Sequence, residues 1–232
     1  MSFGRVCHDM KKRVRMAGGK NEMPTDRILL LFCVPAALLS AVAARASKAR
    51  WPLCVYGALP LFFMAGQLLC LRADGLMNAR TALPLHLCGF SGLLCLPATL
   101  GSEACARFLR RLGVMGALTA LCFPAMLTTS HPILTALCFY LLHAFILFFP
   151  LAAPKKNGGR SGALLIAALL LACAALTDAA LGANYLFLRV IPTGTPFSFL
   201  AALSPALRAA LWGAVMAAAL MWDTQSIRRN KT

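Results

Sequence analysis

The segment ALPLHLCGFSGLLC, residues 82–95, carries a histidine and a thiol inside a run that is otherwise apolar enough to cross a bilayer. An ionisable imidazole at membrane depth costs free energy unless it faces a protein interior or a water-filled cavity, so it predicts a functional site. His86 and Cys88 point about 200° apart on a regular helix, so they cannot act on one another. Any group that works with Cys88 must therefore come from another helix.

The composition of the whole chain predicts a membrane protein. Hydrophobic residues make up 60% of the 232, charged residues make up 13%, and the mean hydropathy is +0.75. Seven apolar stretches each approach the roughly 20 residues that about 30 Å of hydrocarbon requires. They lie at 28–44, 51–71, 82–100, 112–129, 132–153, 161–182 and 199–222.

Long continuous apolar runs lack the alternation of barrel strands, so helices are expected. The predicted fold is all-α: a polytopic membrane protein whose seven transmembrane helices occupy residues 28–222. A basic N-terminal tail, 1–27, and a basic C-terminal tail, 223–232, flank this domain.

The net charge of +16 points to lipid partners. The basic residues lie at segment ends, not on one amphipathic face, which favours anionic lipid headgroups over nucleic acid as the partner. The ten cysteines are scattered, mostly one per apolar stretch, and contain no C-x-x-C, so neither a disulfide framework nor a metal site is indicated. No metal or other cofactor is expected, because no phosphate-binding loop, dinucleotide fingerprint or H-E-x-x-H motif occurs. The oligomeric state is not indicated.

The distribution of lysine and arginine predicts the orientation. Three such residues occur in each of the segments 45–50, 101–111, 154–160 and 223–232, whereas the opposite connections, 72–81, 130–131 and 183–198, carry two, none and one. This asymmetry predicts that the N-terminus lies outside and the C-terminus lies in the cytoplasm. The expected location of this integral membrane protein is a bacterial-type plasma membrane. The seven basic residues of the N-terminal tail oppose this orientation, and a translation start at Met16 or Met23 would remove most of them.

Polar residues gather toward one end of the predicted bundle. With seven spans, the connections after the second, fourth and sixth share one face. The residues near that face are His86, Cys88, His131, Asp178, Asn184 and Tyr185. The last two belong to the segment 182–198, which is too polar and proline-rich to span and is predicted to form a cavity-lining cap. His143 lies deeper, in the fifth span, where an imidazole needs a partner.

A thiol beside an imidazole suits acyl transfer, because the imidazole can take the thiol proton and leave a nucleophilic thiolate. Asn184 and Tyr185 are candidate donors to the developing oxyanion, and Asp178 could orient a histidine. The residues leave open whether His143 or His131 is the base for Cys88. Three of these residues also have a simpler interpretation. Cys88 could be a packing thiol, His131 an interfacial histidine and Asp178 a carboxylate that caps a helix end.

Three motifs resemble a known family. They are Leu83-Pro-Leu-His-Leu-Cys88, Tyr140-Leu-Leu-His-Ala-Phe-Ile-Leu-Phe-Phe-Pro150 and Gly182-Ala-Asn-Tyr-Leu-Phe-Leu188 followed by a proline. In this order they resemble the YwaF-like integral membrane proteins, a family that extends to an animal transmembrane phospholipid acyltransferase with a cysteine nucleophile. The resemblance covers roughly residues 80–222.

The resemblance implies roles for individual residues. Cys88 would accept the acyl group and His143 would be the base, while His86, Asn184 and Tyr185 would be motif positions. His131 matches a histidine near the start of the fifth span. The family's tryptophan- and tyrosine-rich opening of the last span is replaced here by LSPALRAALW, residues 203–212, which indicates a change of substrate or a loss of activity.

The leading hypothesis is an intramembrane Cys–His acyltransferase or lipid hydrolase that acts on phospholipid acyl chains. The alternative is a small permease or lipid-binding membrane protein, whose buried histidines and Asp178 line a pathway without covalent chemistry. A purely structural subunit would explain the seven spans but not the gathering of polar groups.

Overall fold

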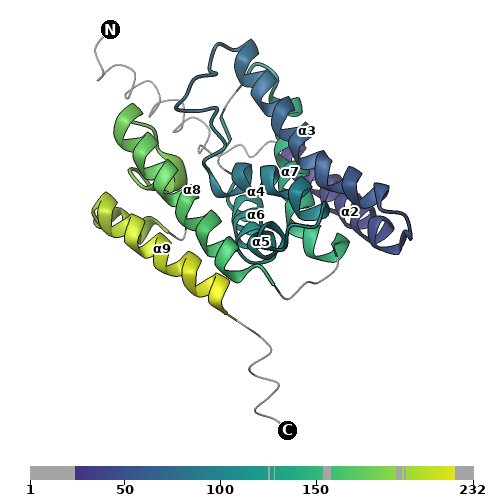
Figure 1. Cartoon of the computed structure of the whole chain (residues 1–232). Coiled ribbons are helices and arrows are strands. Elements are labelled where there is room, and N and C mark those ends of the chain that lie inside the picture. The colour runs from purple at the N-terminus through teal and green to yellow at the C-terminus, as the bar shows by residue number, and fades with distance from the viewer. Residues whose placement is uncertain are drawn as a thin grey trace.

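The computed structural model describes residues 24–124, 126–127, 129–153, 158–191, 195 and 197–222, with side chains from Arg27 onward. Within these ranges the chain is helical and contains no strand (Figure 1). The predicted basic tails lie outside the described residues, apart from residues 24–27.

The helices follow one another along the chain with short connections. The α-helices are α2 (Pro24–Ala46), α3 (Trp51–Ala73), α4 (Leu87–Thr99), α5 (Glu103–Phe108), α6 (Val114–Cys122), α7 (Pro132–Ala152), α8 (Arg160–Leu181) and α9 (Pro205–Met221). A π-helical segment, η1 (Leu109–Gly113), joins α5 to α6, and two 3₁₀ segments, η2 (Tyr185–Phe187) and η3 (Ser198–Ala202), lie between α8 and α9. Because α5, η1 and α6 are continuous, the described chain forms seven helical segments.

Four helices in the described part of the chain, α2, α3, α7 and α8, are long and apolar enough to cross a membrane. The helices α4 and α9 are apolar but shorter. Large apolar side chains on the long helices are exposed: Leu31 is 72% exposed, Phe62 69% and Leu176 70%. Apolar surface of this extent is expected where a helix faces lipid. The structure therefore supports a helical membrane protein in which these four helices are candidate spans.

The described residues form three packed clusters, of which the smallest holds Cys33, Ala136 and Tyr140. The helix α7 is the centre of the first cluster, and it contacts α2, α3 and α6. Small residues of α2, among them Ala37 and Ala41, are fully buried in this cluster and allow the helix backbones to approach closely. The hydroxyl of Tyr56 on α3 donates a hydrogen bond to the carbonyl of Phe145 on α7, at 3.0 Å. This bond satisfies the phenol inside the apolar core.

The second cluster joins α8 and α9 to α5, η1 and the segment that contains η2. Phe108, Leu170, Tyr185 and Leu220 are almost completely buried in it. In Figure 1, α8 and α9 lie on one side of the molecule, α2 and α3 lie on the other, and α4 to α6 occupy the space between them. The start of α4 borders this second cluster through Leu85 and other partly buried apolar residues.

The predicted fourth span, 112–129, has the wrong limits, because the helix begins at Glu103 and ends at Cys122. The predicted connection 101–111 is accordingly helical. Its N-terminus is capped by the Ser102 hydroxyl, which accepts a hydrogen bond from the backbone N–H of Cys105.

Two arginines in the continuous helix formed by α5, η1 and α6 bind the end of α9. Arg107 donates from Nε and Nη2 to the carbonyl of Leu220, at 3.1 and 2.8 Å, and Arg111 Nη2 donates to the carbonyl of Trp222, at 2.9 Å. The last carbonyls of a helix lack intrahelical donors, so these side chains complete α9.

Two further boundaries differ from the prediction. The predicted third span begins at residue 82, but α4 begins at Leu87, because Pro84 and the turn around it keep residues 82–86 outside the helix. The predicted last span begins at residue 199, but α9 begins at Pro205 after η3. A proline in the first turn is favourable because its missing N–H has no helical partner there, and Ser204 caps this helix through the N–H of Leu207.

Candidate functional site

The connections after α3, α6 and α8 meet at one end of the molecule, as the span count predicts. Asp74, at the end of α3, accepts hydrogen bonds from the backbone N–H of Ser130, at 2.7 Å, and from the Ser130 hydroxyl. These bonds join the α3–α4 connection to the α6–α7 connection and hold the pKa of the Asp74 carboxyl below its ordinary value.

Tyr185 joins the α8–α9 connection to the same end. Its hydroxyl donates to the carbonyl of Ala79, at 2.8 Å, and accepts from the N–H of Leu83, at 3.1 Å. The backbone N–H of Tyr185 donates to Oδ1 of Asp178, at 2.7 Å. Asp178 on α8 therefore positions Tyr185, which in turn holds the loop that leads into α4. Tyr185 is fully buried, and this burial raises the pKa of its phenol.

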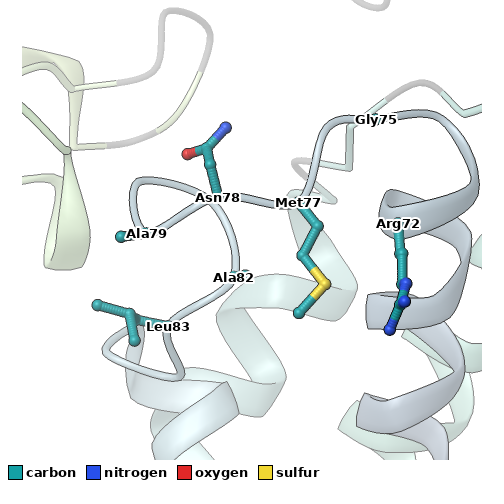
Figure 2. Close-up of a pocket in the computed structure, with 7 residues that line it drawn as sticks. All are labelled: Arg72, Gly75, Met77, Asn78, Ala79, Ala82 and Leu83. Carbon is teal, nitrogen blue, oxygen red and sulfur yellow. The ribbon is translucent and has the colours of Figure 1, made fainter.

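The loop between α3 and α4 borders a cavity of about 520 Å³, shown in Figure 2. The residues that line it are Arg72, Gly75, Met77, Asn78, Ala79, Ala82 and Leu83. Met77 and Asn78 leave the loop in opposite directions, and the Asn78 Oδ1 accepts from the N–H of Arg80, at 2.8 Å. This cavity lies beside the chain that leads to His86 and Cys88, and its wall is mostly apolar.

His86 lies between two aromatic rings of the α8–α9 connection. The centroid of its imidazole is 5.2 Å from that of Tyr185 and 5.3 Å from that of Phe187. The structure therefore places His86 beside Tyr185, whose backbone N–H is bonded to Asp178.

The turn that carries these rings has an unusual backbone. Leu186 and Phe187 have φ values of 51° and 55°, a left-handed conformation that is costly for residues with a side chain. Asn184 stabilises the turn, because its Oδ1 accepts from the N–H groups of Arg189 and Val190, at 3.0 and 2.9 Å, and its Nδ2 donates to the Val190 carbonyl, at 2.8 Å. Both Asn184 and Tyr185 thus bond to the protein itself, and their action on an oxyanion stays a prediction.

Cys88 lies in the first turn of α4 and is half-buried. Its sulfur packs against the bare backbone of α6, since a Cβ placed on Gly116 would lie 3.3 Å from Cys88 Sγ and 2.8 Å from Leu87 Cδ2. In the part of the chain that the structure describes, no hydrogen bond joins Cys88 to an imidazole. Sequence reasoning did not single out Gly116, because a glycine inside an apolar helix carries no signal of what it contacts.

His143 lies inside α7 and is 4% exposed. Its Nδ1 is 2.6 Å from the carbonyl oxygen of Phe139, whose ring centroid lies 4.1 Å from that of the imidazole. A carbonyl can only accept, so Nδ1 must carry the proton and Nε2 is left as an acceptor. This tautomer is the one that a general base requires.

His131 has different surroundings, at the N-terminus of α7. It is exposed and lines a second cavity, of about 400 Å³, with Pro132, Ile133, Leu134 and Leu137. His143 follows it by twelve positions, or about 18 Å along a helix. The two histidines therefore cannot serve the same position, and the exposure of His131 favours the interfacial interpretation.

Comparison with known proteins identifies the family. The model of the TMEM164 family matches residues 21–222. The chain belongs to the TMEM164 family. Neither a curated protein nor a solved structure matches the chain.

The TMEM164 match covers every predicted site residue, from His86 to Tyr185, and excludes most of both basic tails. It confirms the resemblance at the level of a membrane protein family, although not under the YwaF-like name. Among the described residues of this TMEM164-family chain, no group of three or more His, Cys, Asp or Glu side chains is placed to hold a metal ion.

Proposed function

We propose that this TMEM164-family chain is an intramembrane acyl-transfer enzyme that acts on phospholipid acyl chains and uses Cys88 as the acyl acceptor. The observation that carries the proposal is the network through Tyr185, which joins α8, η2 and the α3–α4 loop directly before the thiol-bearing turn of α4. A cysteine that only fills space in the core would not need a hydrogen-bond network to fix the position of residues 83–88. The exposed apolar faces of the surrounding helices would contact lipid, so phospholipid esters would lie close to this segment.

The tautomer of His143 supports its assignment as the base. In the proposed reaction, the Cys88 thiol gives its proton to Nε2 of the imidazole, and the sulfur forms a bond to the carbonyl carbon of a phospholipid ester. The bond from that carbon to the glycerol oxygen breaks, and the imidazolium returns the proton to this oxygen. The products of the first step are a Cys88 thioester and a lysophospholipid.

The second step transfers the acyl group to an acceptor. The hydroxyl of a second lysophospholipid, or water, attacks the thioester carbon and gives its proton to the imidazole, and the departing sulfur takes that proton back. Both steps require Cys88 Sγ and His143 Nε2 to approach to hydrogen-bond distance when lipid binds, as catalytic pairs commonly do on forming the substrate complex.

The experiment uses the full chain in nanodiscs that contain phosphatidylcholine with an isotope-labelled acyl chain, together with an unlabelled lysophospholipid acceptor. Transfer of label to the acceptor, or its release as fatty acid, is expected for the wild type, is abolished by Cys88→Ala and is strongly reduced by His143→Gln. The matched control is Cys122→Ser, which removes an exposed thiol from the end of α6 and should leave transfer unchanged.

Undiminished transfer by Cys88→Ala would overturn the proposal. A wild type that binds phospholipid but transfers no label to either acceptor would favour the alternative, a lipid-binding protein or permease. In that case Cys88→Ala should be silent, whereas His143→Gln should still impair lipid movement between leaflets.

A further inference from the structure

Arg208 is a buried cation for which the described residues supply no hydrogen-bond or ion-pair partner. It lies in the first turn of α9, is 5% exposed, and its Nε is buried with no hydrogen bond. Among the described residues, no carboxylate forms an ion pair with it. An arginine side chain is always charged, and burying such a charge without a partner is costly.

Trp212 adds a second unpartnered donor on the same face of α9. Its Nε1 is buried without a hydrogen bond, and residues four apart lie one above the other on a helix. A buried indole N–H usually has an acceptor. Two neighbouring donors that both lack an acceptor among the described residues favour an acceptor supplied by a ligand.

The other buried arginine near α9 shows how the protein satisfies such a group when it is structural. Arg107 is 8% exposed, and its guanidinium donates twice to the Leu220 carbonyl at the opposite end of the same helix. Arg208 has no comparable bond. The guanidinium of Arg107 therefore caps a helix, whereas that of Arg208 has donors left for a ligand.

The surroundings of Arg208 favour a lipid as the source of the acceptor. Trp212 packs at the edge of the second cluster and near the ring of Phe197, with 6.2 Å between their centroids, while the outer face of α9 exposes 57% of Leu207 and 40% of Leu211. A ligand at this place would meet two donors on one side and apolar surface on the other. A phospholipid presents an anionic phosphate and acyl chains in this combination.

Asp178 is the acidic side chain on the neighbouring helix α8, at the end where α9 begins. It is 2% exposed, its Oδ1 accepts from Tyr185, and its Oδ2 has no partner. No ion pair joins it to Arg208 in the described chain, so it does not neutralise the arginine.

We propose that Arg208 and Trp212 bind the phosphate group of a phospholipid whose acyl chains lie along α9. The planar guanidinium can donate two parallel hydrogen bonds to phosphate oxygens, and the indole N–H can donate a third. This inference deepens the proposed function by placing the headgroup of its substrate class, but the binding site requires no chemistry at Cys88.

The test measures ligand binding to the full chain in detergent, in a Cys88→Ala background, so that turnover cannot affect the result. The probes are dioctanoylphosphatidylcholine, dioctanoylglycerol, octanoate and inorganic phosphate, and binding is followed by native mass spectrometry and by the rise in Tm with ligand concentration. The variants are Arg208→Met, Arg208→Lys and Trp212→Phe. The control, Arg50→Gln, removes the same charge from an exposed position.

Dioctanoylphosphatidylcholine should bind roughly 10- to 100-fold more weakly to Arg208→Met, the factor expected for a lost hydrogen bond to a charged group. Trp212→Phe should lose less, Arg208→Lys should be intermediate, and Arg50→Gln should bind as the parent does. Without ligand, the Tm of Arg208→Met should be no lower than that of the parent, because the substitution removes an unpaired buried charge.

Equal binding of dioctanoylphosphatidylcholine to the parent and to Arg208→Met would overturn the inference. So would a lower ligand-free Tm of that variant with an unchanged lipid-induced rise, which would show a structural role. Equal binding of dioctanoylglycerol, octanoate or inorganic phosphate by the parent would overturn the assignment to a phospholipid. If lipid binding depends on Arg208 but the wild type transfers no acyl group, only the proposed function fails.

Discussion

Tyr185→Phe removes one oxygen atom from the centre of the network that positions the start of α4. The hydroxyl is the partner of both the Ala79 carbonyl and the Leu83 N–H, and the residue is fully buried. Each lost hydrogen bond costs about 1 kcal/mol, and leaving its buried partner unsatisfied raises this toward 2, so the free energy of unfolding should fall by about 2–4 kcal/mol. Hydrogen exchange at residues 79–88 should also become faster, because the loop loses its attachment to η2.

The assay is denaturant unfolding in detergent, combined with hydrogen–deuterium exchange. The matched control is Tyr56→Phe, which removes one buried hydrogen bond, to Phe145, in the first cluster. It should lower the free energy of unfolding by about 1–2 kcal/mol and leave exchange at residues 79–88 unchanged. If Tyr185→Phe instead unfolds like the wild type and its exchange at residues 79–88 is unaltered, the hydroxyl does not hold the loop and the reasoning is refuted.

Three other perturbations test separate parts of the structure. The hydrogen bonds from Ser130 lower the pKa of Asp74. The stabilisation that they provide is therefore complete above the unfolded-state pKa, near 4, and is lost as the pH falls through the lower folded-state value. Ser130→Ala should raise the pKa of Asp74 in an NMR titration, and an unchanged pKa would argue against the hydrogen bonds between Ser130 and Asp74. Gly116→Ala places a methyl group against the start of α4 and should slow acylation of Cys88 several-fold in the nanodisc assay, whereas full activity would show that α4 adjusts freely. Arg107→Ala removes two hydrogen bonds to the end of α9 and should lower the free energy of unfolding by about 2–3 kcal/mol in a denaturant titration, with no change expected if the bonds are absent in solution.

The sequence predicts the number and approximate position of the helical segments. Lipid requires long apolar helices, and these are visible in the sequence as long stretches of high hydropathy. It also predicts that the connections after α3, α6 and α8 share one end, which the bonds of Asp74 and Tyr185 confirm. These results depend on segment length and on the count of spans alone.

The errors arise where tertiary contacts override composition. Arg107 and Arg111 make residues 101–111 resemble a solvated connection, yet both bind carbonyls at the end of α9, more than a hundred residues away. The sequence around these arginines does not indicate that their partner is the end of α9.

The site residues show the same division between local and long-range information. The contact between His86 and Tyr185 follows from the end of the molecule that their two connections share. The role of Asn184 in its own turn does not, because it depends on left-handed residues that have no glycine to mark them. Arg208 was part of the segment that differs from the family pattern, but only its burial without a partner distinguishes it from an interfacial arginine.

The most direct test of the central claim is to trap the acyl group on the protein. The full chain in nanodiscs is given phosphatidylcholine with a ¹³C-labelled acyl chain and no acceptor, is quenched with acid, and is digested for mass spectrometry. Acyl transfer through Cys88 predicts the labelled acyl mass on the peptide that contains Cys88, its removal by hydroxylamine and its absence from Cys88→Ser. Label confined to a different cysteine, or turnover of lipid by Cys88→Ser at the wild-type rate, would contradict the account.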